Sequence, residues 1–286
     1  MTRRLALLVC LAVCLGCDSL GMGAEMRSWY RAADPIHIAG PIHFVGTHGL
    51  GVYLIKTDAG HILLFGGMPG SADLIEANIR KLVEPKDIKL ILTCHAHMDH
   101  VGTHARMKEL TGAEIVAMDR ETELLASGGK TDFAYGGQSF FEFTAVKADR
   151  TVSDGGQVTL GGVTLTAHLT PGHTKGTTTW STTVTEDGRS YFVVFADGTS
   201  VNPGYRLTKD PSYPGIADDY RKTFAVLESL EPDIALHPHT SVFEFESRRE
   251  GAKTEGVAAF VDREAYKRFV AERKKLFEQA LAAESP

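Results

Sequence analysis

Cysteine is scarce in this chain of 286 residues, and three of its four cysteines, Cys10, Cys14 and Cys17, lie close to the amino terminus. Only Cys94 lies beyond them, so the rest of the chain has no cysteine pair for an internal disulfide. We interpret Cys94 as a small buried hydrophobic residue at a strand end, because no nucleophile-type sequence surrounds it. The sequence therefore tolerates an oxidising compartment without exploiting it.

Clustered positive charge is also missing. The chain has 30 Lys and Arg against 36 Asp and Glu, which gives a net charge of −6, and no basic block stands out. This balance argues against a nucleic-acid surface and against a polyanionic substrate. The hydrophobic share of 43% is ordinary for a soluble globular enzyme. We therefore expect a small-molecule substrate and no nucleic-acid partner.

A long hydrophobic run occurs only in the first segment, MTRRLALLVCLAVCLGCDSLGMGA. Two arginines, an apolar stretch from Leu5 to Cys17 and a small-residue end form the pattern of a secretory signal peptide, too short to span a bilayer as a helix. We predict that residues 1–24 are removed after Ala24, that residues 25–286 form a single domain, and that the protein is a periplasmic monomer with no stable membrane span. A cut before Cys17, with a lipid anchor on it, is the alternative.

Strand-type and helix-type patterns alternate in both halves, with no low-complexity linker between them. Strands are predicted at residues 41–46, 51–60, 61–67, 88–94, 113–118, 155–170, 177–185 and 190–198, and helices at 71–83, 104–112, 119–125, 216–230 and 262–283. This order predicts one α/β domain in which a strand-rich layer from each half is covered by helices.

The segment HAHMDH at residues 95–100 follows an apolar strand and concentrates metal-ligand side chains. His95 and His97 are two residues apart, so on extended chain they point the same way, and zinc accepts imidazole and carboxylate ligands. Asp99 repeats this spacing, whereas His100 enters a turn and points elsewhere. One short loop is therefore able to serve two adjacent metal ions.

Further ligands are expected where other strands end. His173 follows the tight turn of Pro171 and Gly172, and His237 and His239 end a β-type run. The remaining histidines, in ordinary strand, turn or helix contexts, are expected to be packed or solvated: His37, His43, His48, His61, His104 and His168.

HAHMDH, PGHTKG and the late strand-end histidine together resemble the metallo-β-lactamase superfamily. The stretches DFAYGG, VTLGGVTLTAHLTPGHTKGTTTW, NPGYRL and YPGIADDYRKTF resemble its class B lactamases of the third subclass, and the similarity runs from about Val45 to His239. The resemblance implies an αβ/βα four-layer sandwich, in which two mixed β-sheets are flanked by helices and hold two zinc ions in a groove at their edges.

The resemblance also implies a ligand set. The first zinc would be held by His95, His97 and His173, and the second by Asp99, His100 and His239. His239 is preferred to His237 because family members place this ligand six residues after the aspartate of the preceding strand, here Asp233. His237 remains a neighbour of the site or an alternate ligand.

The implied reaction is opening of the β-lactam ring of penicillins, cephalosporins and carbapenems by a zinc-bound hydroxide that Asp99 orients. No serine or cysteine nucleophile is needed. Thr199 and Ser200 fall where family members bind the substrate carboxylate through small hydroxyl residues. The alternative interpretation of this pair is that both side chains cap local backbone.

Two positions depart from the family pattern, and a third leaves another function open. Phe65 stands where the family often has an acid, and Gly198 where related enzymes often have a serine near the second zinc. Asp197 is one step from the pattern of glyoxalase-like and lactonase-like members, in which an aspartate bridges the metals, so thioester or lactone hydrolysis is the alternative activity. A zinc-binding module without turnover is opposed by the completeness of the ligand set.

Overall fold

The computed structural model describes residues 19–284, so most of the predicted signal segment lies outside the described residues. The described chain begins with helix α2 (Ser19–Trp29), which crosses the predicted cleavage position after Ala24. No helix between residues 19 and 284 combines the length and apolarity needed to cross a bilayer.

The first half of the chain forms a seven-stranded mixed sheet whose strands follow chain order. Its strands are β1 (Ile36–Ala39), β2 (Ile42–Phe44), β3 (Tyr53–Thr57), β4 (Gly60–Leu64), β5 (Ile88–Leu92), β6 (Glu114–Met118) and β7 (Arg150–Val152). Strands β1 to β4 pair antiparallel, and β4 to β7 pair parallel. Parallel β5 and β6 require crossover helices, which the chain supplies between them.

The second half forms a five-stranded sheet in the order β12-β11-β10-β9-β8. Its strands are β8 (Gln157–Leu160), β9 (Val163–Leu169), β10 (Thr178–Glu186), β11 (Arg189–Phe195) and β12 (Ile234–Leu236). All neighbours pair antiparallel except β11 and β12, which are parallel. The carboxyl ends of β11 and β12 therefore lie at one edge of the sheet.

The two sheets pack face to face around an aromatic core. In β9 every second side chain, Leu165, Ala167 and Leu169, is buried, as expected of a strand with one face on a core. Tyr53 of one sheet and Phe195 of the other lie 5.2 Å apart between ring centroids. Each such ring removes a large apolar area from water, worth about 25 cal/mol per Å².

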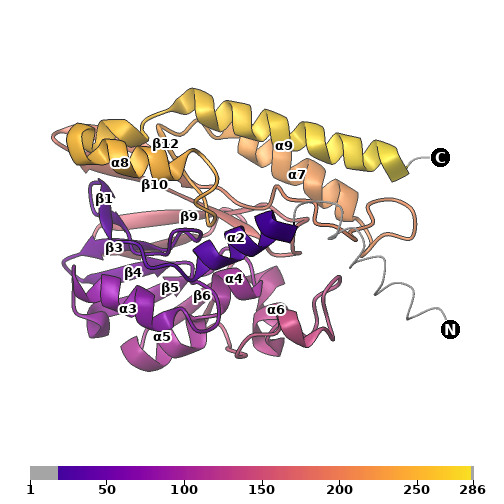
Figure 1. Cartoon of the computed structure of the whole chain (residues 1–286), viewed down its shortest axis with the longest axis horizontal. Helices are drawn as coiled ribbons and strands as arrows, with labels where there is room; N and C mark the ends of the chain where they lie inside the picture. Colours follow the sequence, from indigo (N-terminus) through magenta and orange to yellow (C-terminus); the bar gives the residue numbers. More distant parts are fainter. Residues whose placement is uncertain (1–18, 285–286) are drawn as a thin grey trace.

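Helices cover the outer face of each sheet (Figure 1). The seven-stranded sheet carries α3 (Ala72–Arg80), α4 (Met98–Val101), α5 (His104–Thr111) and α6 (Thr122–Ser127), and the other carries α7 (Ile216–Ser229) and α9 (Arg263–Glu284). Helix α8 (Phe245–Glu255) and the short 3-10 helices η1 (Pro85–Asp87), η2 (Asp119–Glu121), η3 (Ser139–Phe141) and η4 (Gly256–Phe260) complete the described elements. The predicted four-layer αβ/βα arrangement is confirmed.

Local signals set several helix ends. Gly112 ends α5 in the left-handed conformation, with φ of 71°, as the sequence predicted. The predicted helix at residues 119–125 is instead a 3-10 turn, η2, followed by α6.

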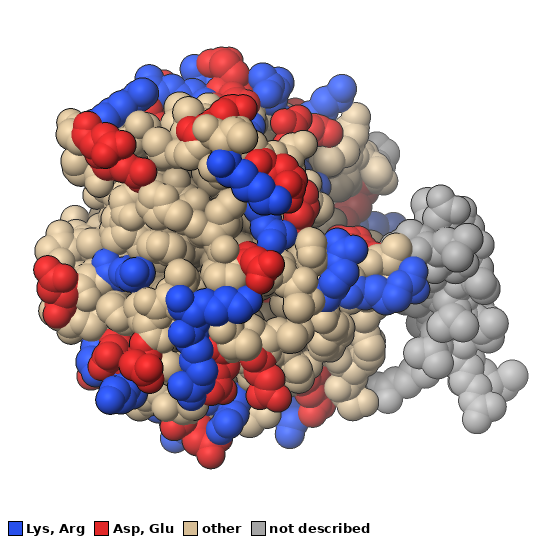
Figure 2. Space-filling model, turned by 60° about the vertical axis from the view of Figure 1, so that its left-hand side comes forward, with Lys and Arg blue, Asp and Glu red and all other residues tan. Residues whose placement is uncertain are grey.

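On the face shown in Figure 2, basic and acidic side chains are interspersed, as expected from the absence of charge blocks in the sequence.

Candidate metal centre

The HAHMDH segment lies between the end of β5 and the first turn of α4. His97 has extended backbone, with φ of −95° and ψ of 153°, and α4 begins at the next residue. His95 and His97 therefore precede the helix, whereas Asp99 and His100 belong to its first turn. This change of backbone conformation divides the motif into two pairs of side chains.

The other sheet holds this loop in place. The amide of Thr178 donates to the carbonyl of Cys94 at 2.8 Å, and the indole Nε1 of Trp180 donates to the carbonyl of Thr93 at 3.0 Å. Both donors belong to the first three residues of β10, in the five-stranded sheet. The site therefore lies where the two sheets are tied to each other.

Three imidazoles converge in the first cluster. His97 Nδ1 and His173 Nε2 are 3.1 Å apart, and one ring nitrogen from each of His95, His97 and His173 lies within 4.8 Å of the others. Tetrahedral zinc with Zn–N bonds of ~2.0–2.1 Å needs ligand nitrogens about 3.3 Å apart. The Nε2 atom of His95 is buried without a hydrogen-bond partner in the described chain. This donor set fits zinc.

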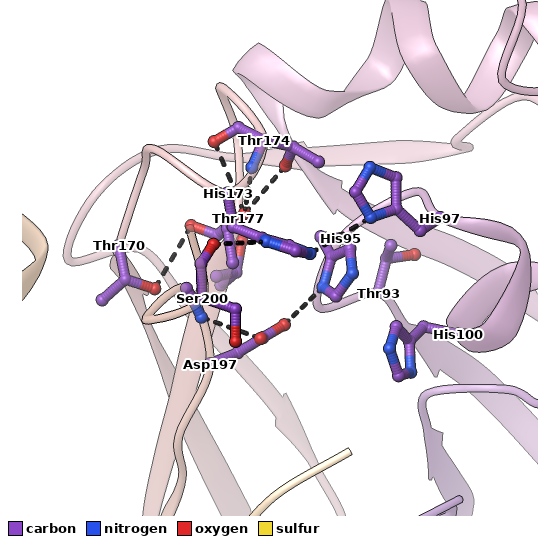
Figure 3. Close-up of polar contacts among 12 residues, drawn as sticks. Thr93, His95, His97, His100, Thr170, His173, Thr174, Thr177, Asp197 and Ser200 are labelled. Atoms are coloured by element: carbon purple, nitrogen blue, oxygen red, sulfur yellow. Dashed lines mark hydrogen bonds and ion pairs between the residues drawn. The ribbon is translucent and has the colours of Figure 1, made fainter. Parts of the chain in front are cut away.

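The opposite nitrogen of each imidazole has an acceptor, and Figure 3 shows the acceptors of His95 and His173. His95 Nδ1 donates to Asp197 at 2.6 Å, and His173 Nδ1 donates to the Ser200 carbonyl at 2.9 Å. His97 Nε2 donates to Asp132 at 3.2 Å. Such partners fix which nitrogen carries the proton and leave the other one free for a metal.

The second cluster is centred on one oxygen of Asp99. Its Oδ2 atom lies 3.0 Å from His100 Nε2 and 3.4 Å from His239 Nε2. A carboxylate and two imidazoles also suit zinc. The structure thus brings together all six residues of the expected ligand set in two adjacent clusters.

Burial keeps the imidazoles of His100 and His173 neutral. It lowers the pKa of His100 to about 4, against the opposing charge of Asp99. Burial, followed by the neighbouring rings of His95 and His97, lowers the pKa of His173 well below its usual value. Burial works to raise the pKa of Asp99, but the neighbouring His100 and His239 hold it well below the ordinary range. Neutral imidazole and ionised carboxylate are the forms that bind metals.

His237 lies beside the second cluster, and its ring plane is inclined by 36° to that of His239. Its Nδ1 accepts a hydrogen bond from the amide of His239 at 2.9 Å, and its ring lies 5.7 Å from that of Phe269. His239, in contrast, packs its ring 4.7 Å from His100. His237 borders the cavity, but His239 is the histidine that faces Asp99.

Asp197 lies behind His95. Its Oδ2 accepts from His95 and its Oδ1 accepts from the amide of Gly198 at 2.8 Å. Burial works to raise the pKa of Asp197, but the neighbouring His95 and its hydrogen bond outweigh that effect and hold the pKa far below the ordinary range. With both oxygens engaged in this way, Asp197 orients an imidazole.

The two predicted substrate-binding hydroxyl residues differ in position. Ser200 borders the cavity, and its carbonyl also accepts from Tyr220 at 2.6 Å. Thr199 is buried, and its hydroxyl has no hydrogen-bond partner among residues 19–284. Of the pair, Ser200 alone belongs to the described cavity wall.

The clusters open into a cavity of about 460 Å³, within the range of sites for small molecules. Apart from the histidines and Asp99, its walls include Glu25, Met26, Trp29, Gly129, Asp132, Tyr135, Phe140, Phe141, Asp197, Ser200, Asn202 and Pro203. None of the described lining residues is Lys or Arg. The walls are largely apolar, so a ligand anion depends on metal ions and on neutral donors.

Two acidic residues of the site were missed in the sequence. Asp132 lies in the DFAYGG stretch, which was noted only for its resemblance. Glu121 is buried and accepts from the Ala96 amide at 2.6 Å, the Thr174 hydroxyl at 2.8 Å and the Gly176 amide at 2.9 Å. Burial raises the pKa of Glu121, and these hydrogen bonds oppose that rise. A buried position next to α6 gave no sequence signal of this role.

Residues 52–239 match the family model of the metallo-beta-lactamase superfamily, and the chain belongs to that superfamily. The subclass B3 metallo-beta-lactamase BJP-1 of Bradyrhizobium japonicum is 38% identical and aligns over 91% of this chain and 98% of its own, with a TM-score of 0.85. FEZ-1 from Legionella gormanii is 37% identical over 89% of this chain and 97% of its own, with a TM-score of 0.87. The resemblance to the third subclass is confirmed.

Two less similar proteins are also described as metal-dependent enzymes. The class B3 di-zinc enzyme LRA-12 from an Alaskan soil metagenome is 33% identical over 89% of this chain and 96% of its own, with a TM-score of 0.84. A probable metallo-hydrolase of Burkholderia pseudomallei is 28% identical over 175 residues, 58% of this chain and 56% of that protein. The chain thus spans about half the length of this curated relative.

Proposed function

We propose that the protein is a zinc-dependent β-lactamase that opens the ring of penicillins, cephalosporins and carbapenems. The observation that carries this proposal is the pair of ligand clusters at the cavity, in a chain that aligns nearly end to end with subclass B3 enzymes. A hydrolase of this kind needs no serine or cysteine nucleophile.

We propose two zinc ions, one held by His95, His97 and His173 and the other by Asp99, His100 and His239. Bound zinc supplies a nucleophile from water near neutral pH and polarises a carbonyl oxygen. LRA-12 is a di-zinc enzyme, and the two adjacent clusters here support the same stoichiometry.

The remaining steps fall to side chains of this protein. Asp99 is ionised and belongs to the second cluster, next to His95 of the first, where its carboxylate would orient the attacking water. The aromatic wall of Tyr135, Phe140 and Phe141 excludes water and packs against apolar substituents of the substrate. Ser200 and Asn202 supply neutral hydrogen bonds to its carboxylate, since no Lys or Arg lines the described cavity.

The engagement of Asp197 argues against the alternative activity. An aspartate that bridges two metals must present its oxygens to them, whereas here one accepts from His95 and the other from Gly198. We therefore rank thioester or lactone hydrolysis below β-lactam hydrolysis.

We also propose export to the periplasm through removal of residues 1–24. The support is the arginine-led apolar pattern of that segment. Mass spectrometry of the protein purified from the periplasmic fraction measures the new amino terminus. Glu25 is the expected first residue, and a lipidated Cys17 would contradict the proposal.

Ultraviolet assays with a penicillin, a cephalosporin and a carbapenem test the function. We expect hydrolysis by the zinc-loaded protein, loss of activity with a chelator, and recovery when zinc is restored. His173→Ala should lower kcat/KM by at least about 100-fold, because outer partners alone change activity 10–100-fold. His37→Ala, on an exposed residue of β1, is the matched control.

Zinc-loaded protein that opens a lactone or thioester but no β-lactam would contradict the proposal. Binding of zinc without turnover of any of these substrates would favour a zinc-binding module instead.

A further inference from the structure

Glu121 joins two loops that carry all three nitrogens of the first cluster. Its Oε1 accepts from the amide of Ala96, the residue between His95 and His97. Its Oε2 accepts from the hydroxyl of Thr174, the residue after His173, and from the amide of Gly176. Only 1% of Glu121 is exposed, so all three hydrogen bonds are shielded from water.

The two loops come from different sheets. The loop that carries His95 and His97 follows β5 of the seven-stranded sheet, and the loop that carries His173 connects β9 to β10 of the other sheet. The facing nitrogens of His97 and His173 are only 3.1 Å apart. A small slip of one loop past the other would change this separation, and metal sites respond to shifts of this size.

The glycine of PGHTKG permits this contact. A Cβ atom on Gly176 would lie 2.4 Å from the backbone nitrogen of Glu121, a distance that real Cβ atoms do not reach. Any side chain at position 176 would push the loop away from Glu121. The close approach therefore depends on glycine at this position.

We propose that Glu121 is a positioning residue of the first zinc site. Its carboxylate sets the register between the two ligand loops and places a buried acceptor group close to His95 and His97. The inference rests on the proposed function only in taking the bound ion to be zinc. Removal of comparable outer partners lowers metal affinity by about 10–100-fold.

The main test compares Glu121→Gln with the unmodified protein by zinc competition against a chromophoric chelator. Glutamine keeps one acceptor oxygen and replaces the other by an NH2 group, which cannot accept a hydrogen bond. The loop whose donors face that NH2 group therefore loses a hydrogen bond to residue 121. We expect the first zinc to bind about 10–100-fold more weakly. The d–d spectrum of the cobalt-substituted protein should change too, because it reports ligand geometry directly.

Glu123→Gln is the matched control, since it removes the same charge from an exposed residue two positions away. It should leave both zinc affinity and the cobalt spectrum unchanged. Thr174→Val removes one of the three hydrogen bonds while the carboxylate stays, so it should weaken zinc binding less than Glu121→Gln does.

A folded Glu121→Gln protein with the original zinc affinity and cobalt spectrum would overturn the proposal. If this variant does not fold, Thr174→Val and Gly176→Ala decide, and unchanged zinc affinity in both would overturn it equally. These measurements need no turnover. A protein that binds zinc but hydrolyses no β-lactam therefore refutes the proposed function and leaves the role of Glu121 to be judged on its own data.

Discussion

Replacement of Asp197 by asparagine should weaken the first zinc site. The carboxylate accepts from His95 Nδ1 at 2.6 Å and from the Gly198 amide at 2.8 Å. His95, Asp197 and Gly198 are all buried. Asparagine offers one acceptor oxygen, so one of these two donors must face an NH2 group. The remaining bond to His95 also loses the negative charge.

The size of the effect follows from the hydrogen bonds. Bonds to charged groups contribute about 1.5–3 kcal/mol and neutral ones about 0.5–1.5 kcal/mol, so the change costs about 1–1.5 kcal/mol. About 1.4 kcal/mol corresponds to tenfold in a binding constant. We therefore expect the first zinc to bind about tenfold more weakly, with the second zinc little affected.

Zinc competition with a chelator and elemental analysis measure both quantities. Asp187→Asn is a suitable control, because Asp187 is exposed in the β10–β11 turn and its φ of 50° is a conformation that asparagine tolerates. Unchanged affinity in Asp197→Asn would refute the orienting role of this carboxylate. Loss of both zinc ions would instead indicate that Asp197 bridges them.

Two further predictions concern residues on either side of β12. His239→Ala should lower the zinc content from two ions to one, whereas His237→Ala should retain both; elemental analysis measures this, and the opposite pattern would make His237 the ligand. Asp233 accepts from Phe192 and from Arg263, and these contacts hold its pKa below the ordinary range although burial works to raise it. Asp233→Asn should therefore reduce the free energy of unfolding by about 1.5–3 kcal/mol at pH 7. The lowered pKa means that the folded protein favours the ionised carboxylate of Asp233, and protonation removes this contribution. The difference in free energy of unfolding between Asp233→Asn and the unmodified protein should therefore shrink as the pH falls below about 3.9. Urea titrations at several pH values measure it, and a deficit that persists at low pH would contradict the reasoning.

Local sequence patterns predicted most of the strands and helices and, together with the family resemblance, the side chains that meet in the two clusters. Alternating strands such as 163–169 and the stop at Gly112 predict their elements directly, because these signals are written within a few residues. The two pairs of side chains in HAHMDH likewise follow from a local signal, because the change from extended chain to helix after His97 separates them.

Contacts between distant segments were not predictable in this way. Glu121 and Asp132 contact the loop of His95 and His97 across 25 and 35 residues of chain, and no local pattern around either residue predicts the contact. Thr199 and Ser200 are adjacent, yet the turn at Gly198 buries one and leaves the other at the cavity.

Phe65 is a related case. The sequence marked it as a departure from the family pattern, and the structure gives it a positive φ of 69° and a buried ring. That ring lies 6.0 Å from Tyr53 and 6.1 Å from Phe195. An acid at this position would leave the aromatic core without one of its rings, so the departure is compensated by packing between the sheets.

Helix α2 brings Glu25, Met26 and Trp29 to the cavity, and Trp29 lies 5.7 Å from the ring of His239. The mouth of the site is therefore completed by the first residues that follow the predicted cleavage position. Any residues left in front of Glu25, whether an uncut leader or a purification tag, extend from that wall. Versions of the protein with different amino termini would accordingly differ at the cavity mouth, and their catalytic constants would differ even though the metal centre is the same.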